Sequence, residues 1–230
     1  MFKKLFRLLA RGDDDSYLAF FFIFLVIAVF IMGPLDLNSR FRFYSQPVFS
    51  LMVITGVFAT TGSRWMRSAS IGLAILDFMV SVINSYFDRI TFEVLDVAIT
   101  GVALMFLTGA ILTRVFRDGE VNFYRIIGSV CAYILVGLIW GFAYYIFFLF
   151  DPSAFLFSGK VALPHSIAMY DLSYFSFVTL FTVGYGDILP FHPFVRSLTT
   201  LEGLIGQLYP AILIARLVSM EIEMNRGKGK

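Results

Sequence analysis

Cysteine, charge and catalytic motifs are scarce in this sequence. Cys131 is the only cysteine among 230 residues, which excludes a disulfide framework or a cysteine metal cluster within the chain. It lies in an apolar stretch, and we interpret it as a small buried hydrophobic residue. The net charge of +2, without a basic run, argues against nucleic-acid binding. Because no zinc-binding helix, nucleophile elbow or phosphate-binding loop is present, nothing in the sequence supports catalysis.

Apolar residues are abundant instead. The sequence is 59% hydrophobic and 15% charged, whereas soluble proteins average about 45–50% apolar and about 25% charged residues. A chain of 230 residues cannot bury so large an excess of apolar surface in its own core. No strand alternation and no internal repeat is visible, so we expect an all-α protein embedded in a lipid bilayer.

Six segments are apolar enough for a helix to cross the hydrocarbon core, which takes about 20 residues. They cover residues 17–33, 47–62, 69–87, 94–112, 126–150 and 197–220. Residues 151–196 are too polar to span and contain four prolines (Pro152, Pro164, Pro190 and Pro193). Lys and Arg concentrate on one side of these spans, which predicts that both termini are cytoplasmic and that residues 151–196 lie outside.

The first 15 residues differ from a signal peptide. Arg7 breaks the apolar run, and three aspartates at 13–15 stand where a small-residue cleavage pattern would be required. Apolar and basic residues alternate at helical spacing, so residues 1–15 are predicted to form an amphipathic helix at the cytoplasmic interface. Residues 223–230 form a short cytoplasmic tail in the same arrangement, without a regulatory domain.

A short helix is predicted between the fifth and sixth spans, where the sequence reads DLSYFSFVTLFTVGYGDILP. Asp171 or Ser173 can cap its start. Because the helix is too short to cross the bilayer, the chain must dip into the membrane and return. Such re-entrant backbone is tolerated only where protein or a water-filled path surrounds it.

Two glycines follow this helix in alternation with larger residues. Gly184 and Gly186 alternate with Val183 and Tyr185, and glycine reaches backbone conformations that are closed to other residues. This alternation lets successive carbonyl groups point towards one axis. A column of carbonyl oxygens is what a dehydrating cation requires.

At this point the sequence resembles the potassium channel family, whose selectivity filter reads Thr-Val-Gly-Tyr-Gly. All five residues and the following acid are present: Thr182, Val183, Gly184, Tyr185, Gly186 and Asp187. The resemblance implies that the carbonyls of residues 182–186 and the Thr182 hydroxyl bind K+. It also implies a homotetramer, because each chain supplies one loop of a closed ring. No cofactor is implied besides the permeant K+. Residues 16–118 would then form a four-helix domain and residues 119–222 the pore domain.

The surroundings of the filter depart from the family pattern. Phe181 stands where many potassium channels have threonine, and Tyr174 and Phe175 replace paired tryptophans. Val178 occupies the site of a glutamate found in some bacterial relatives. Phe175 cannot donate a hydrogen bond, although Tyr174 could reach Asp187. We therefore expect these residues to support the filter differently, and whether the filter inactivates stays open.

The sixth span contains a predicted kink. Gly206 lies where the family often has a hinge glycine, and Pro210 removes the hydrogen bond to the Gly206 carbonyl. A static bend and a moving hinge are both compatible with this pattern. Gln207, Pro210, Ile214 and Val218 share one face, which the resemblance places on the cavity. The last two could form a hydrophobic gate.

One carboxyl group, that of Glu202, lies on roughly the opposite face of the sixth span in apolar company. Such a carboxyl should be protonated or hydrogen-bonded. Thr179 and Ser176 of the short helix are its candidate partners. We interpret Glu202 as a support for the filter, in preference to an ion-binding site.

Voltage sensing is not expected from the fourth span. It needs about 3–4 gating charges within the membrane, but residues 94–112 contain no Arg or Lys, and Arg114 and Arg117 come too late. Asp77 and Asp96 lie within predicted spans, and functional and structural ion-pair roles remain equally open for both. Candidate basic partners are Arg67 or Arg114 for Asp77 and Arg89 for Asp96.

Two outer histidines, His165 and His192, could tune conductance with external pH. We consider ordinary exposed side chains the simpler interpretation.

Among whole-protein alternatives, a potassium transporter subunit would carry four filter loops, but this chain has one. A non-selective cation channel usually loses the filter tyrosine, whereas Tyr185 is present. An enzyme or scaffold lacks supporting motifs. The sequence thus favours a passive, potassium-selective channel of the plasma membrane.

Overall fold

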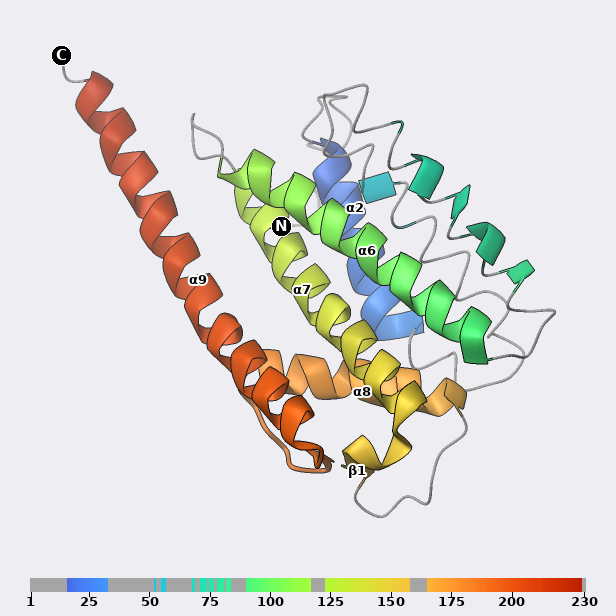
Figure 1. Cartoon of the computed structure of the whole chain (residues 1–230). Helices are drawn as coiled ribbons and strands as arrows, with labels where there is room; N and C mark the ends of the chain where they lie inside the picture. The colour runs from blue at the N-terminus through green and yellow to red at the C-terminus, as the bar shows by residue number, and fades with distance from the viewer. Residues whose placement is uncertain are drawn as a thin grey trace.

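The computed structural model describes residues 16–32, 90–116, 123–157 and 165–228, together with isolated residues between 52 and 83. The described parts are mainly helical (Figure 1). In chain order the elements are helix α2 (Ser16–Val26), π-helix η1 (Ile27–Met32), α6 (Ile90–Val115), α7 (Phe123–Phe150), 3-10 helix η2 (Pro152–Ala154), strand β1 (Phe155–Phe157), α8 (His165–Leu180), β2 (Ile188–Pro190) and α9 (Pro193–Lys228).

Three of the described helices are long and apolar enough to cross a membrane: Ile90–Val115, Phe123–Phe150 and Pro193–Met220. They correspond to the predicted fourth, fifth and sixth spans, each starting a few residues earlier than predicted. The predicted first span corresponds to a shorter apolar helix, Leu18–Ile31, whose last part is π-helix from Ile27 onward. The predicted second and third spans lie largely outside the described residues, as do residues 1–15.

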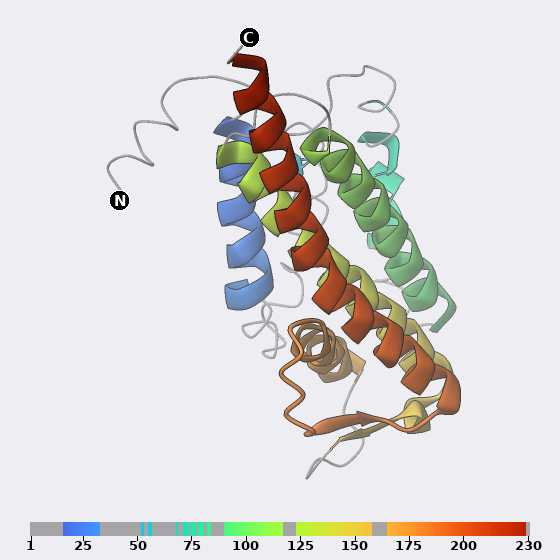
Figure 2. The same cartoon turned by 90° about the vertical axis from the view of Figure 1, so that its left-hand side faces the viewer.

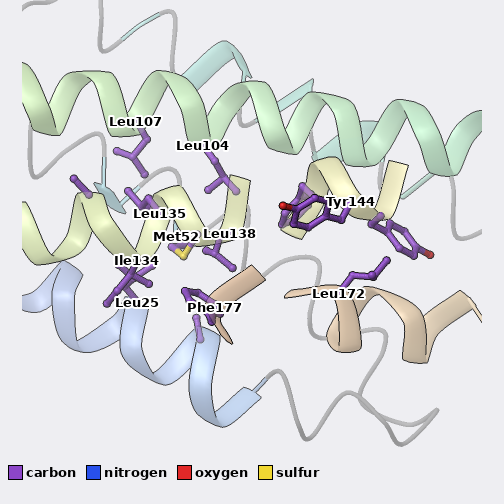
Figure 3. Close-up of a cluster of buried hydrophobic side chains, with 14 of the residues drawn as sticks. Leu25, Met52, Leu104, Leu107, Ile134, Leu135, Leu138, Tyr144, Leu172 and Phe177 are labelled. Carbon is purple, nitrogen blue, oxygen red and sulfur yellow. The ribbon is translucent and has the colours of Figure 1, made fainter. Parts of the chain in front are cut away.

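The hydrophobic core lies around α7, which packs against α2, α6 and α8 (Figure 3). Helices α6 and α7 run side by side in opposite directions, and α2 packs on another face of α7 (Figure 1). Leu104 and Leu107 of α6, Leu135 of α7 and Leu25 of α2 are all fully buried. Cys131 of α7 is likewise fully buried, as the sequence predicted.

Helix α8 crosses the lower ends of α7 and α9 at a steep angle (Figures 1 and 2). Its 16 residues span about 24 Å at 1.5 Å per residue, less than the hydrocarbon core of about 30 Å. It begins at His165, so the predicted caps Asp171 and Ser173 are wrong. The Ser173 hydroxyl instead donates to Met169 O, 2.9 Å away. This hydrogen bond lies within α8, so the Ser173 side chain does not cap the start of the helix.

Helix α9 is the most exposed of the long helices. In the most apolar stretch of α9 only 11% of the residues are buried, whereas the corresponding shares are 50% in α6 and 56% in α7. Its first part contacts α7, α8 and β2, and its second part diverges from α7 (Figure 1). In a single chain, therefore, much of this apolar helix has no protein partner among the described residues.

Candidate functional site

The inner end of the predicted filter is joined to α8 by backbone hydrogen bonds. Val183 N and Gly184 N both donate to Val178 O, at 2.9 and 3.3 Å, and Thr182 N donates to Thr179 O at 2.9 Å. These hydrogen bonds satisfy backbone carbonyl groups in the last turn of α8, as is typical at a helix C-terminus. Val178 was singled out for its side chain, but the contact that the structure shows is made by its backbone oxygen.

Three filter residues have positive φ: Thr182 at 58°, Gly184 at 60° and Gly186 at 77°. A Cβ added to either glycine would have no heavy atom within 4 Å, so conformation alone, and not space within the chain, explains why they are glycine. Thr182 was not expected in this region. A β-branched residue there costs about 1–3 kcal/mol, which is typical of backbone held in place for a function.

The C-terminal half of the predicted filter is contacted by Tyr174 of α8. Its ring stacks on that of Tyr185, with centroids 6.5 Å apart and planes at 5°. Its hydroxyl forms a hydrogen bond with Asp187, the contact expected from the sequence. Desolvation, followed by this hydrogen bond, raises the pKa of Tyr174 above its ordinary value of 10.0. The phenol therefore stays protonated and remains a donor at neutral pH.

The chain directly after Asp187 is held by a two-stranded antiparallel sheet. Strand β2 pairs with β1, so that Phe157 lies opposite Ile188 and Phe155 opposite Pro190. Phe191 N also donates to Ala154 O at 2.8 Å. The C-terminal end of the predicted filter is thus fixed to the segment that follows α7. Because β1 and β2 have only three residues each, an alternation of apolar and polar residues is not recognisable in them, and the sequence did not predict them.

His192 directly precedes helix α9. Phe194 N donates to His192 Nδ1 at 3.2 Å, and Arg196 N donates to His192 O at 3.0 Å. The side chain thus caps the helix, and Pro193 takes the first helical position that suits proline. The exposed side chain of His192 therefore has a structural role that the sequence did not indicate. For His165, only the backbone is described.

Glu202 is fully buried behind α8. Ser176 Oγ lies 2.5 Å from its Oε1, and the Tyr144 hydroxyl donates to its Oε2 at 2.6 Å. The partner in α8 is therefore Ser176, one of the two that the sequence offered. Tyr144 of α7 was missed, because nothing in a sequence relates residues 58 positions apart.

Phe175 belongs to a cluster of three aromatic rings from three elements. Its ring centroid lies 5.2 Å from that of Tyr144 and 5.7 Å from that of Phe155, and the latter two rings are 5.8 Å apart. All three pairs are edge-to-face, the arrangement that aromatic quadrupoles favour. The cluster joins α7, β1 and α8. Phe175 thus contributes by packing, since it has no hydrogen-bond donor.

Helix α8 lies unusually close to α7 at two glycines. A Cβ on Gly137 would lie 2.5 Å from Phe177 Cε1, and one on Gly141 would lie 2.9 Å from Ser173 Cα. The glycines are four residues apart, so they share one face of α7. This G-x-x-x-G spacing in an apolar helix is the signal that could have identified the contact from the sequence.

Helix α9 meets the end of α8 at Gly206. A Cβ there would collide with Leu180 O, so only glycine fits. The Tyr133 hydroxyl of α7 lies 3.0 Å from both Leu180 O and Gly206 O. Phe181 packs on the Tyr133 ring at 5.7 Å. Pro210 lies inside α9, as predicted.

The remaining predicted residues are distributed along the spans. Ile214 and Val218 are 62% and 53% exposed in the single chain, and Gln207 is also exposed. Asp96 of α6 is buried, whereas Asp77 and its candidate partner Arg67 lie outside the described residues. No group of three or more metal-ligating side chains occurs among the residues that the structure describes.

Comparison with protein families gives one match. The family model described as "Ion channel" matches residues 132–223, a range that contains most of α7, all of α8, the filter and most of α9. Searches of curated proteins and of solved structures found no match. The family match and the helices long and apolar enough to span a membrane together support an ion channel that is an integral membrane protein.

Proposed function

We propose that the chain is one subunit of a homotetrameric channel that conducts K+ passively and selectively. The observation that carries this proposal is the sequence Thr-Val-Gly-Tyr-Gly-Asp at the C-terminal end of a half-length helix, with positive φ at both glycines. This combination suits a column of carbonyl oxygens and has no role in an ordinary loop. The ion channel match over residues 132–223 supports the same conclusion.

K+ would bind to backbone oxygens of residues 182–186, which replace its hydration shell. The Thr182 hydroxyl would complete the innermost site. The C-terminal end of α8 points its negative dipole end at this region, which favours a cation. Tyr174 and the β1–β2 pair would hold the outer mouth at the spacing that K+ requires.

Four chains are needed because each supplies one loop. The exposed apolar side chains of α9 support this assembly: Leu204 is 52%, Leu208 47% and Ile212 58% exposed in the single chain. Tyr185, at 70% exposed, would be covered in the same way. A ring with fourfold symmetry closes these surfaces without leaving a free edge.

Conventional voltage gating is not part of the proposal. Helix α6 corresponds to the predicted fourth span, and it has no Arg or Lys between residues 94 and 112. The other expectations are retained: both termini cytoplasmic, a location in the plasma membrane, and a cavity lined by Gln207, Pro210, Ile214 and Val218.

The proposal is tested by K+ efflux from vesicles that contain the purified chain, with two matched glycine variants. Gly186→Ala introduces a Cβ at φ 77°, whereas Gly109→Ala introduces one on α6 with open space around it and no positive φ. We expect wild type and Gly109→Ala to release K+ and not Na+, and Gly186→Ala to release neither. Equal release of both ions by the wild type would contradict selectivity, and undiminished K+ release by Gly186→Ala would contradict the site.

A further inference from the structure

The carbonyl group of Gly206 loses its usual helical partner. In an α-helix it would accept the N–H of residue 210, but Pro210 has none. Gly206 is buried, and a buried carbonyl without a donor is costly. The Tyr133 hydroxyl, from the neighbouring helix α7, lies 3.0 Å from Gly206 O and supplies the missing donor.

The same hydroxyl also reaches the end of α8. Leu180 O is 3.0 Å from Tyr133 Oη, and Leu180 is the last residue of α8, two positions before Thr182. A hydroxyl has one proton, so the two carbonyls share it in a three-centre hydrogen bond. Three elements therefore meet at one oxygen atom: α7, the end of α8 and the turn of α9 that contains Gly206.

The ring of Tyr133 is fixed by its neighbours. It stacks on Tyr209 of α9, with centroids 5.2 Å apart and planes at 15°, and it packs on Phe181 at 5.7 Å. These contacts do not involve the hydroxyl. Replacing Tyr133 with phenylalanine therefore removes the shared hydrogen bond and leaves the ring contacts in place.

We propose that the Tyr133 hydroxyl is a positioning group that holds the Gly206–Pro210 turn of α9 against the C-terminal end of α8. Gly206 is then a contact glycine, required by the close approach of Leu180 O, and any movement of α9 begins beyond Pro210. This hydrogen bond joins α9 to the backbone that leads into the proposed filter. Its consequence for conduction rests on the proposed channel function; the contact itself does not.

A double-mutant cycle with Tyr133→Phe and Pro210→Ala tests the contact. Pro210→Ala restores an N–H that can donate to Gly206 O, so the loss of the Tyr133 hydroxyl should matter less in that background. We expect Tyr133→Phe to lower the thermal midpoint of the full chain in detergent, and Pro210→Ala to reduce that loss. Tyr145→Phe removes a hydroxyl from the same helix that donates to Glu93, and its effect should add to that of Pro210→Ala. If Tyr133→Phe fails to fold, folding of the double variant supports the proposal, and failure of both overturns it.

Single-channel recording tests the consequence for conduction. We expect Tyr133→Phe to change the open probability by about two- to tenfold, the range that one hydrogen bond supports, with the reversal potential unchanged. In the Pro210→Ala background the change should be smaller. An unchanged open probability, or strict additivity of Tyr133→Phe with Pro210→Ala, would overturn the inference while leaving a selective wild-type current intact. Absence of K+ current in the wild type would instead count against the proposed function, and the thermal cycle would still decide the contact.

Discussion

Ser176 Oγ lies 2.5 Å from Glu202 Oε1 and, at the same time, 2.7 Å from Gly137 O. A serine hydroxyl has one proton, and a backbone carbonyl can only accept. If Ser176 donates to Gly137 O, its contact with Glu202 is satisfied only when the carboxyl group is the donor. A neutral Glu202 thus accounts for both distances, and it also avoids a charge in an apolar environment within the membrane.

The first prediction concerns this carboxyl. Glu202→Gln should retain near wild-type stability and currents, because its amide N–H₂ can donate to Ser176 while its oxygen accepts from Tyr144. Glu202→Ala should destabilise the protein, since it leaves the buried Tyr144 hydroxyl without its acceptor, at a cost of about 1–3 kcal/mol. Thermal midpoints in detergent and currents in bilayers measure both effects. A large loss in Glu202→Gln, comparable with that in Glu202→Ala, would show that the carboxyl acts as an anion.

The second prediction concerns Tyr174. Tyr174→Phe keeps the ring stacked on Tyr185 but loses the hydrogen bond to Asp187, which is worth about 0.5–1.5 kcal/mol net. We expect a lower thermal midpoint and more frequent closing of the filter during sustained K+ current. Phe175→Leu is the matched comparison, because it disturbs ring packing and removes no hydrogen bond.

The pH dependence of this contact has a defined sign. The folded pKa of Tyr174 is raised above its ordinary value of 10.0, so its contribution to stability is fully present below about pH 10 and is lost as pH rises through the folded pKa. The difference in thermal midpoint between wild type and Tyr174→Phe should therefore stay constant from pH 7 to 9. A difference that disappears within this interval would contradict the assigned contact.

The third prediction concerns the close approach of α7 and α8. Gly141→Ala places a Cβ 2.9 Å from Ser173 Cα, where backbone must move, and such overpacking costs about 1–3 kcal/mol. Gly109→Ala meets open space and should stabilise by about 0.5–1 kcal/mol, because alanine is the better helix former. The two thermal midpoints should move in opposite directions. A Gly141→Ala variant as stable as the wild type would show that α8 does not press on this face.

The sequence predicted the parts of this site that depend on neighbouring residues. The short helix α8 and the proline in α9 can be recognised from local patterns, whereas the filter that follows α8 stays a prediction. Contacts between distant segments could not be predicted in this way: Tyr133 and Tyr144 are two of many apolar-span tyrosines until α7 is packed against α8 and α9. The start of α8 was misjudged, because Asp171 and Ser173 are typical caps but residues 165–170 already form a helix.

Selectivity for K+ is the central claim, and a reversal potential tests it most directly. The chain is reconstituted in a planar bilayer with a tenfold K+ gradient, balanced by Na+ so that total monovalent cation is equal on both sides. A K+-selective filter predicts a reversal potential near the K+ equilibrium value, about 59 mV in magnitude for a tenfold ratio. A reversal potential near zero, with current flowing, would show that Na+ passes equally well and would contradict the account.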